Sequence, residues 1–460
     1  MTQKYDAIII GSGQGGNPLA HKLADAGWQV ALIEKEYLGG TCVNYGCTPT
    51  KTMMASARLA HYARTAPRLG VETGPISVNL QKVIDRKNDI VHQWRQGQQE
   101  NTASRPSLHL YRGHARFTAP HTIAVNDDLL TSTHIIINTG TRPRTIPLPG
   151  LDTIDYLTNR TIMQLTNLPE HLLVLGGSYI GLEFGQMFAR FGSRVTIIER
   201  AKNIISREDS DVAQTLQDAL TNEGLTIHTN SQAKAVTPNG SAGLTLTIDT
   251  ADGTTHSIIG SHLLLAIGRQ PNSDDLGLDK AGIETDSRGY IKTDEFLQTN
   301  VDGVWAMGDV KGGPAFTHIA YDDHFTIYQA LINQQQRSIA NRIIPYGLFT
   351  DPELGRVGLS EKEARAQGYK LKIGSIPMSW VARAIERDET AGLMKIVINA
   401  ENDRILGAAI LGAEGAELVQ TLMALMMADA PYTIFEKSIY IHPTLTEGFF
   451  TLMDNVQPVD

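Results

Sequence analysis

Cysteine is scarce in this chain of 460 residues, which contains only Cys42 and Cys47. Two cysteines are too few for a secreted fold held together by disulfides, so that class of protein is excluded. Basic residues are also in the minority, because 40 lysines and arginines stand against 49 acidic residues and leave a net charge of −9. This mild acidity argues against nucleic acid or an anionic membrane surface as the partner.

Long apolar runs and low-complexity segments are missing as well. No stretch reaches the ~20 apolar residues that are needed to cross a bilayer. A strand is expected from residue 5 onward, which leaves no room for a secretion signal, so we expect a cytoplasmic protein. The length exceeds what one hydrophobic core supports and predicts about three domains.

The two cysteines lie close together, at the ends of the segment CVNYGC at positions 42–47. Four residues separate them, enough for a bend that lets the sulfurs meet in a small ring. In a reducing compartment, a disulfide is more often catalytic or regulatory than structural. The alternative is two small buried side chains that happen to be neighbours. The glycine-rich segment GSGQGG at positions 11–16 makes that alternative much less favourable, because it points to a dinucleotide close by.

A strand–turn–helix–strand pattern occurs twice in the chain. The first copy comprises residues 5–10, the loop at 11–16, residues 18–26 and residues 30–34, and the second comprises residues 172–175, the loop GGSYIG at 176–181, residues 182–191 and residues 194–199. Each copy ends in a glutamate, Glu34 or Glu199, 23 residues after the first glycine of its loop. That spacing brings a carboxylate to the ribose of a bound dinucleotide. The sequence therefore predicts an α/β fold with two Rossmann-like dinucleotide-binding domains.

The rest of the chain divides into recognisable segments. Helices are expected over residues 53–66 and 80–102, the second with Ile84, Ile90, Val91 and Trp94 on one apolar side. Buried strands are expected over residues 135–137, 263–267 and 304–307, each followed by a glycine-containing turn. From about residue 347, alternating segments such as 394–398 and an apolar helix over 416–428 predict a C-terminal α+β domain with an antiparallel sheet.

In this order, the motifs resemble those of the flavin-dependent pyridine-nucleotide disulfide oxidoreductases, the family that includes glutathione reductase, lipoamide dehydrogenase and mercuric reductase. The likeness spans essentially the whole chain and rests on residues 11–16, 39–51, 139–140, 176–183, 268–272, 308–309 and 442–447. It implies a discontinuous FAD-binding domain of residues 1–150 and 272–340, an NAD(P)H-binding domain of residues 151–271 and a dimerisation domain of residues 341–460. It also implies a homodimer in which each active site is completed by the partner subunit's His442.

The resemblance assigns the first glycine loop to FAD. Gly11, Gly13 and Gly16 let the backbone turn tightly and approach a pyrophosphate at a helix N-terminus. Glu34 is then expected to bind the hydroxyls of the adenosine ribose. Further FAD contacts are implied for Thr41, Lys51, Ala115, Thr139, Gly140 and Asp309, the last of them to the ribityl chain of the flavin.

The second loop is assigned to NAD(P)H, with contacts implied for Gly176, Tyr179, Gly181, Glu199 and Gly268. Ser178 replaces the middle glycine of this loop, and its side chain narrows the approach to the backbone. Tyr179 matches a tyrosine that covers the flavin until the nicotinamide arrives, and a packed core tyrosine is the alternative.

The preferred nicotinamide cofactor is only weakly indicated. Glu199 favours NADH, because a carboxylate binds a ribose 2′-hydroxyl and repels a 2′-phosphate. However, Arg200, Lys202 and Arg207 follow closely and could hold that phosphate, so NADPH stays open.

The resemblance also distributes the catalytic roles. It makes Cys47 the sulfur nearest the flavin and Cys42 the exposed sulfur that attacks the substrate as a thiolate. His442 is the expected general acid–base, and Glu447 orients it. Glu183 is expected to pair with Lys51, whose charge would stabilise the reduced flavin. No resident metal site is expected.

Three electron acceptors remain open. A small disulfide or a related oxidised sulfur compound is the leading hypothesis, because His442 and Glu447 suit a thiol leaving group. The segment NYGCTPTK at positions 44–51 looks closer to mercuric reductases, which favours a thiophilic metal ion, mercury or copper. Mercuric reductases, however, carry a second cysteine pair that is missing here. The third possibility is a lipoamide dehydrogenase subunit of a 2-oxoacid dehydrogenase assembly.

Overall fold

The first glycine loop lies at the end of a strand in a five-stranded parallel sheet of the computed structural model, which describes residues 2–240 and 243–459. The strands are, in order across the sheet, β18 (Val304–Ala306), β8 (Ile135–Ile137), β2 (Ala7–Ile10), β3 (Val30–Glu34) and β4 (Leu108–Arg112). The runs of isoleucine in β2 and β8 are buried on both sides, as expected for central parallel strands. Because β18 joins from far along the chain, this sheet is built from two separate segments.

Both faces of this sheet are covered. Helices α1 (Gly16–Asp25) and α8 (Thr317–Ile332) pack on one face through a core that includes Leu19, Leu23 and Ile327. On the other face lies a small sheet of β1 (Thr2–Lys4), β7 (Asp128–Thr131), β6 (Thr122–Val125) and β5 (Ala115–Ala119), together with α7 (Leu278–Ala281). The layering buries the strands and leaves the loops at their carboxyl ends free to form a site.

The second glycine loop occupies the same position in a second parallel sheet. That sheet contains β12 (Thr226–His228), β11 (Arg194–Ile198), β10 (His171–Leu175) and β16 (His262–Leu265), with helices α5 (Tyr179–Phe191) and α6 (Ser210–Asn222). An antiparallel sheet of β13 (Gln232–Pro238), β14 (Leu244–Asp249) and β15 (Thr255–Gly260) packs against it. A short ribbon of β9 (Thr141–Pro143) and β17 (Arg269–Pro271) joins the two modules. The predicted repeat of one supersecondary unit is therefore present.

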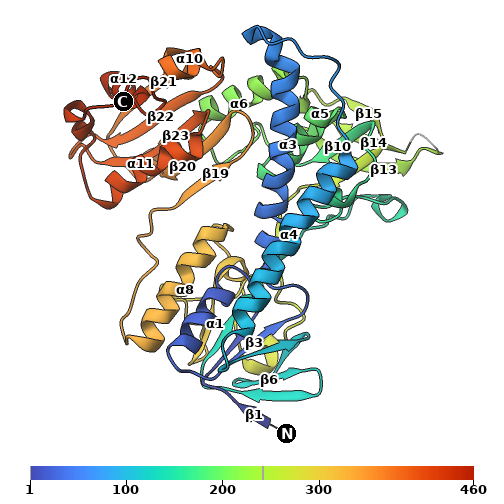
Figure 1. Ribbon diagram of the computed structural model, residues 1–460, viewed down its shortest axis with the longest axis vertical. Helices are drawn as coiled ribbons and strands as arrows, with labels where there is room; N and C mark the ends of the chain where they lie inside the picture. Colours follow the sequence, from blue (N-terminus) through green and yellow to red (C-terminus); the bar gives the residue numbers. More distant parts are fainter. Residues whose placement is uncertain (1, 241–242, 460) are drawn as a thin grey trace.

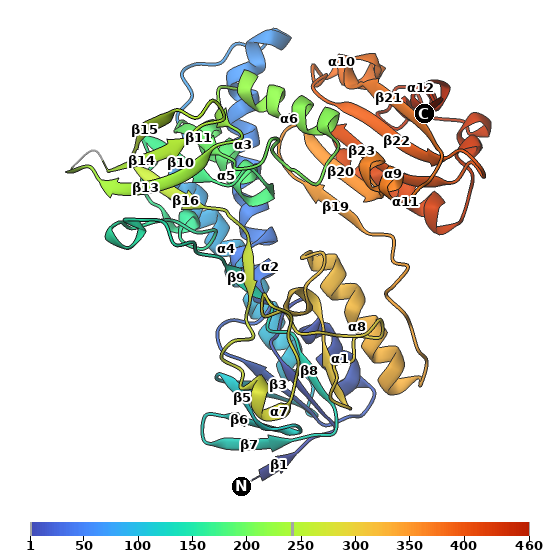
Figure 2. The same cartoon turned by 180° about the vertical axis from the view of Figure 1, so that it is seen from behind.

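The C-terminal domain is built on a six-stranded antiparallel sheet, shown in orange and red in Figures 1 and 2. Its strands are, in order, β19 (Pro345–Leu348), β20 (Glu353–Gly358), β23 (Ile405–Gly412), β22 (Leu393–Asn399), β21 (Leu371–Pro377) and β24 (Gln457–Val459). Its helices are α9 (Glu361–Ala366), α10 (Ala382–Glu386), α11 (Gly415–Met427) and α12 (Gly448–Asp454). The antiparallel α+β class predicted for this part of the chain is confirmed.

Helices α2 (Gly40–Tyr45), α3 (Cys47–Thr65) and α4 (Leu80–Ala103) connect the two parallel-sheet modules, as the blue helices in Figure 1 show. The buried side of α4 includes Ile84 and Val91, as expected, but Trp94 is 51% exposed, and the expectation that it packs inward is wrong. The inward-facing stripe is instead completed by Leu80 and Val83 near the start of the helix. In the part of the chain that the structure describes, no helix has both the length and the hydropathy needed to cross a membrane.

Candidate active site

A long pocket of about 1260 Å³ runs past both glycine loops and the two cysteines. Of the residues expected to act on or bind cofactors, it is lined by Gly11, Gly13, Glu34, Thr41, Cys42, Cys47, Lys51, Ala115, Thr139, Gly140, Tyr179, Glu183, Gly268 and Asp309. Within the described part of the chain, its lining does not include Gly16, Gly176, Gly181, Glu199, His442 or Glu447. The structure thus brings together most of the expected site, whereas the histidine and its glutamate lie in the C-terminal domain, away from this pocket.

The first glycine loop has the shape that a pyrophosphate needs. Gly11 has a φ of +100°, and a Cβ atom placed on it would lie 2.4 Å from the backbone oxygen of Asn138. A Cβ atom on Gly16 would lie 2.0 Å from the backbone oxygen of Gly11. The loop leads directly into α1, whose first N–H groups and dipole favour an anion. The residues therefore fit the pyrophosphate of FAD.

A buried amide that the sequence did not single out holds this loop. Asn138 follows strand β8, and its Oδ1 accepts a hydrogen bond of 2.8 Å from the backbone N–H of Gly16. Its Nδ2 donates to the backbone oxygen of Met307 over 3.1 Å. Asn138 thereby fixes the start of α1 against the turn after β18. A polar residue directly after three buried isoleucines was the signal for it in the sequence.

The two glutamates that are expected to bind ribose, Glu34 and Glu199, are each held by backbone N–H groups. Glu34 accepts hydrogen bonds from the backbone N–H groups of Ser12, at 3.0 Å, and Glu36, at 2.9 Å. Glu199 accepts from the N–H groups of Gly177 and Ala201, both at 2.7 Å. Each carboxylate is thus fixed at the carboxyl end of its sheet, with lone pairs left over for hydroxyl groups.

The serine in the second loop is accommodated without strain. Ser178 has a φ of −110° and a ψ of −171°, an extended backbone that any residue adopts. The close contact in this loop falls one residue earlier, because a Cβ atom on Gly177 would lie 3.0 Å from the Cβ of Glu199. A Cβ atom on Gly181 would lie 1.9 Å from the backbone oxygen of Gly176. The positions that need glycine therefore have it.

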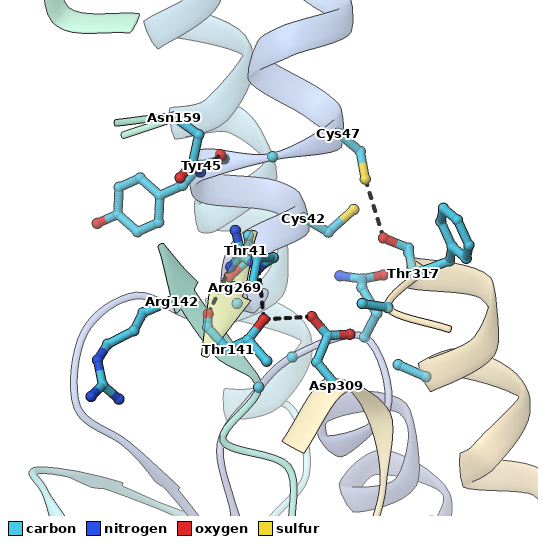
Figure 3. Close-up of a pocket in the computed structure, with 18 of the residues that line it drawn as sticks. Thr41, Cys42, Tyr45, Cys47, Thr141, Arg142, Asn159, Arg269, Asp309 and Thr317 are labelled. Atoms are coloured by element: carbon cyan, nitrogen blue, oxygen red, sulfur yellow. Dashed lines mark hydrogen bonds between the residues drawn. The ribbon is translucent and has the colours of Figure 1, made fainter. Parts of the chain in front are cut away.

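The two cysteines lie on either side of a sharp break in the chain. Cys42 belongs to α2 and Cys47 begins α3, and Gly46 between them has a φ of −135° and a ψ of −115°. Both are free thiols, and their side chains point to the same side, toward Thr317 (Figure 3). In this single chain, Cys47 projects from the first turn of α3 into the pocket and is exposed, whereas Cys42 is half-buried.

The surroundings of the pair favour a thiolate on Cys47. A hydrogen bond from Cys42, the hydroxyl of Thr317 and the charge of Lys51 together lower the pKa of Cys47 to about 6, against the effect of burial. The pKa of Cys42 is raised, first because its thiol donates to Cys47 and then because of burial. Thr317 is the first residue of α8, so the positive end of that helix dipole also faces the sulfurs. Cys42 thus needs a separate base before it can act as a nucleophile.

Lys51 lies on α3 one helical turn after Cys47. Its Nζ forms an ion pair of 2.7 Å with Glu183 Oε2 on α5, and it lies 4.4 Å from the centre of the Phe349 ring. Glu183 also accepts a hydrogen bond of 3.0 Å from the backbone N–H of Phe349. These contacts hold the ammonium group in one position at the wall of the pocket, where it can stabilise negative charge.

A chain of polar contacts fixes Asp309. Its Oδ2 accepts a hydrogen bond of 2.8 Å from the hydroxyl of Thr141, which in turn accepts one of 2.7 Å from Arg269 Nε (Figure 3). Burial lowers the pKa of Arg269. Nearby, Thr139 and Asn272 exchange two hydrogen bonds, of 2.7 Å and 2.8 Å, where the chain returns from the second module to the first. Thr141 and Arg269 are site residues that the sequence did not reveal, because only the ribbon between the modules brings them to Asp309.

His442 and Glu447 form a pair in the C-terminal domain. The Nδ1 of His442 lies 3.0 Å from Oε1 of Glu447, which leaves the other ring nitrogen free to exchange protons. The side chain of His442 is 73% exposed. Ile439 and Ile441, which lie three residues and one residue before it, are 101% and 80% exposed. Exposed isoleucines beside a histidine are typical of a surface that another chain covers.

Comparison with known proteins agrees with this geometry. Residues 5–323 match the family described as pyridine nucleotide-disulphide oxidoreductase, and residues 344–453 match the dimerisation domain of the same family. The chain is 35% identical to the probable pyridine nucleotide-disulfide oxidoreductase RclA of Escherichia coli, over 99% of this chain and 100% of that protein. It is 33% identical to a mercuric reductase of Staphylococcus aureus, over 90% of this chain and 76% of that enzyme.

A solved structure gives the same result. The Cu(II) complex of RclA from Escherichia coli, a flavoprotein disulfide reductase induced by HOCl, superposes with a TM-score of 0.89 at 34% identity, covering 98% of this chain and 99% of that one. The expected fold and the expected family are thus both confirmed. The chain belongs to the pyridine nucleotide-disulfide oxidoreductase family and is an FAD-dependent disulfide oxidoreductase that uses NAD(P)H.

Proposed function

We propose that the electron acceptor is a small disulfide or a related oxidised sulfur compound, reduced at Cys42 and Cys47. The observation that carries this proposal is the unequal pair of thiols, with a depressed pKa at Cys47 and a raised pKa at Cys42. Such a pair keeps one sulfur as an electron donor on the pocket side and the other as a thiol that a base can activate. We also propose a cytoplasmic location, which cell fractionation would test.

The cofactor sites follow from the same assignment. We propose that the loop of Gly11, Gly13 and Gly16 holds FAD, together with Glu34 and Asp309. Bound FAD would accept hydride from the nicotinamide and deliver an electron pair to the disulfide form of the cysteine pair. Thr41, Lys51, Ala115, Thr139 and Gly140 would complete its site, and Gly176, Tyr179, Gly181, Glu199 and Gly268 would bind the nicotinamide cofactor.

The thiol steps can be written from the residues of the chain. The partner subunit's His442 takes the proton of Cys42, and the thiolate attacks one sulfur of the substrate to form a mixed disulfide. The histidine then returns that proton to the departing thiolate. Cys47 attacks the sulfur of Cys42, closes the internal disulfide and releases the second thiolate, which takes a proton from water. Two electrons pass from the cysteine pair to the substrate.

The dimer makes a separate test of these roles possible. Because His442 lies outside the pocket of its own chain, we propose that the dimerisation domain brings it to the other subunit. His442→Ala should slow the thiol steps by about 100-fold and leave flavin reduction by NAD(P)H unchanged. Mixing His442→Ala with Cys42→Ser subunits should restore activity in one of the two sites of each mixed dimer. No restored activity in mixed dimers would show that each histidine serves its own chain.

We propose NADH as the preferred nicotinamide cofactor. The carboxylate of Glu199 is held by Gly177 and Ala201 at the place expected for the ribose, where a 2′-phosphate would be repelled. The comparison of kcat/KM for NADH and NADPH tests this preference. Glu199→Ala should lower the ratio of kcat/KM for NADH to kcat/KM for NADPH by about 10-fold or more. If the wild type prefers NADPH, the 2′-phosphate is instead bound by Arg200, Lys202 or Arg207.

Copper is the second candidate acceptor, because a relative of 34% identity has been solved as a Cu(II) complex. A pair of soft thiol ligands binds copper readily. Two Cu(II) ions would each take one electron as the two thiolates become a disulfide. Steady-state NAD(P)H turnover with a panel of small disulfides that includes lipoamide, and with Cu(II) and Hg(II), distinguishes the acceptors. Turnover with the metal ions and none with any disulfide would overturn the proposal.

A further inference from the structure

The ring of Tyr179 rests against two aromatic rings from other parts of the chain. Phe316, just before α8, lies with its ring centre 6.0 Å from that of Tyr179, and the planes are at 78°. Tyr346, in β19, lies 5.9 Å away at 79°. Phe316 and Tyr346 are themselves stacked, with centres 5.3 Å apart. Edge-to-face contacts of this kind are favourable, so the two stacked rings form a seat for Tyr179.

The ring of Tyr346 is held in place by two buried side chains, Glu208 and Arg356. The hydroxyl of Tyr346 donates a short hydrogen bond to Glu208, and Nε of Arg356 lies 3.5 Å from Oε2 of the same carboxylate. Tyr346 and Arg356 are direct neighbours across strands β19 and β20. The side chains of Glu208 and Arg356 are only 1% and 3% exposed. Burial raises the pKa of Glu208, whereas the charge of Arg356 and the hydrogen bond from Tyr346 oppose that rise, so the contacts of Glu208 with Arg356 and Tyr346 stabilise its carboxylate in this buried position.

Glu208 belongs to the loop that also carries Glu199 and Arg207. Glu199 ends the second nucleotide-binding unit, and Arg207 lines the long pocket. Asp209, the residue after Glu208, accepts hydrogen bonds from the backbone N–H groups of Glu361, at 3.0 Å, and Lys362, at 3.1 Å, at the start of α9. The nucleotide loop is therefore fixed to the C-terminal domain at two adjacent points, and only the first of them reaches the ring of Tyr346.

We propose that Tyr346 is a positioning residue that sets the closed position of Tyr179, and that Glu208 and Arg356 hold Tyr346 for this purpose. The inference rests on the proposed nicotinamide site and on the role that the family resemblance implies for Tyr179, which covers the flavin until the nicotinamide arrives. When Tyr179 swings away, it loses its edge contacts with Phe316 and Tyr346. The nicotinamide cofactor binds only those molecules in which Tyr179 has swung away. Stronger contacts with Phe316 and Tyr346 leave fewer molecules in this open form, and the apparent affinity falls in proportion to the open fraction.

The experiment measures binding rather than turnover. FAD-loaded wild type, Tyr346→Leu and Tyr346→Phe are titrated by calorimetry with tetrahydro-NADH, which cannot give up hydride. Tyr346→Leu removes one ring of the seat and should tighten binding about threefold to tenfold. Tyr346→Phe keeps the ring but loses the hydrogen bond to Glu208, and it should tighten binding about twofold. The order of the two variants distinguishes positioning from general damage, since damage to the fold would weaken binding.

Lys395→Met provides the matched control. Lys395 forms ion pairs with Asp209, at 3.3 Å, and Asp211, at 2.8 Å, at the same domain boundary but not at the seat. This variant should lower the unfolding temperature and leave the affinity for tetrahydro-NADH unchanged. If Lys395→Met tightens the binding of tetrahydro-NADH as much as the Tyr346 variants do, the effect belongs to the whole contact between the nucleotide loop and the C-terminal domain, and the proposal is overturned.

The remaining outcomes are also decisive. Unchanged or weaker binding in both Tyr346 variants, with a wild type that binds tetrahydro-NADH and reduces its acceptor, would overturn the role of Tyr346 and leave the proposed function intact. If Tyr346→Leu does not fold, Tyr346→Phe alone decides, because unchanged binding in it contradicts the proposal. A wild type that takes up FAD but cannot bind tetrahydro-NADH would overturn both the role of Tyr179 and this inference.

Discussion

The sulfur of Cys47 lies 3.1 Å from the hydroxyl oxygen of Thr317, although 270 positions separate the two residues in the chain. Cys47 begins α3 and Thr317 begins α8, so the N-termini of two helices meet at one sulfur (Figure 3). Both helix dipoles and the hydroxyl group favour negative charge there. The thiolate on Cys47 is therefore a property of the tertiary structure rather than of the local sequence.

The first prediction concerns the contribution of Thr317 to this thiolate. The pKa of Cys47 is lowered to about 6, so in the reduced protein the thiolate is present above that pH and is lost as the pH falls through it. Thr317→Val removes a hydrogen-bond donor and should raise the pKa by about 0.5–1 unit. Ultraviolet titration of the reduced protein measures the thiolate directly. Thr317→Ser, which keeps a hydroxyl group, should behave as wild type, and an unchanged titration in Thr317→Val would contradict the assignment.

The second prediction separates the roles of the two sulfurs. Cys42→Ser should lose disulfide turnover by at least about 1,000-fold, because serine is a far weaker nucleophile than a thiolate. Bleaching of the flavin by NADH should remain, because Cys42 takes no part in that step. Stopped-flow absorbance and steady-state turnover measure the two quantities in one preparation. Wild-type turnover in Cys42→Ser would refute the assignment of this sulfur as the nucleophile.

The third prediction concerns the ion pair between Lys51 and Glu183. Lys51→Met removes the positive charge from the wall of the pocket and should slow flavin reduction by NADH about 10-fold to 100-fold. Glu183→Gln leaves the charge but loosens its position, so a smaller loss is expected. Lys82→Met, on the exposed side of α4, is the control and should have no effect. Equal rates in all three variants would show that Lys51 does not act on the flavin.

The fourth prediction concerns Asn138. Asn138→Leu has a similar volume but loses both hydrogen bonds and leaves the N–H of Gly16 without its acceptor. The loss should destabilise the loop by about 1–3 kcal/mol and weaken FAD binding by about 10-fold or more. Fluorescence titration of the apoprotein with FAD measures the affinity. If FAD binds Asn138→Leu as tightly as wild type, the amide does not organise the loop.

Much of the fold was predictable because its signals are local. The strand around Ile8, the glycine loops and the glutamates at positions 34 and 199 each lie within one supersecondary unit. The hydrophobic period and the turn residues of such a unit specify it without knowledge of the rest of the chain. The antiparallel sheet of the C-terminal domain was also predictable, although β22 is buried at every position and does not alternate between buried and exposed residues.

The parts that were not predictable depend on contacts between distant segments. Thr317, Asn138 and Tyr346 reach the site because α8 begins there, β8 ends there and β19 runs past it. Nothing in the local sequence of Thr317 or Tyr346 indicates a partner, and the one local signal at Asn138 is its polar side chain after three buried isoleucines. For Trp94, the local pattern instead predicted a contact that the structure lacks. This residue continues the helical period of α4 but lies outside the part of the helix that packs inward. The exposure of Cys47 relative to Cys42 likewise depends on how α3 faces the pocket.

The most direct test of the account is the number of electrons that the purified flavoprotein takes up. An anaerobic titration with dithionite, followed by the flavin absorbance, counts them. FAD and the Cys42–Cys47 disulfide should together accept about four electrons per chain in wild type, and the flavin alone should accept about two in Cys47→Ser. An uptake of about two electrons in wild type would show that the cysteine pair does not exchange electrons with the flavin.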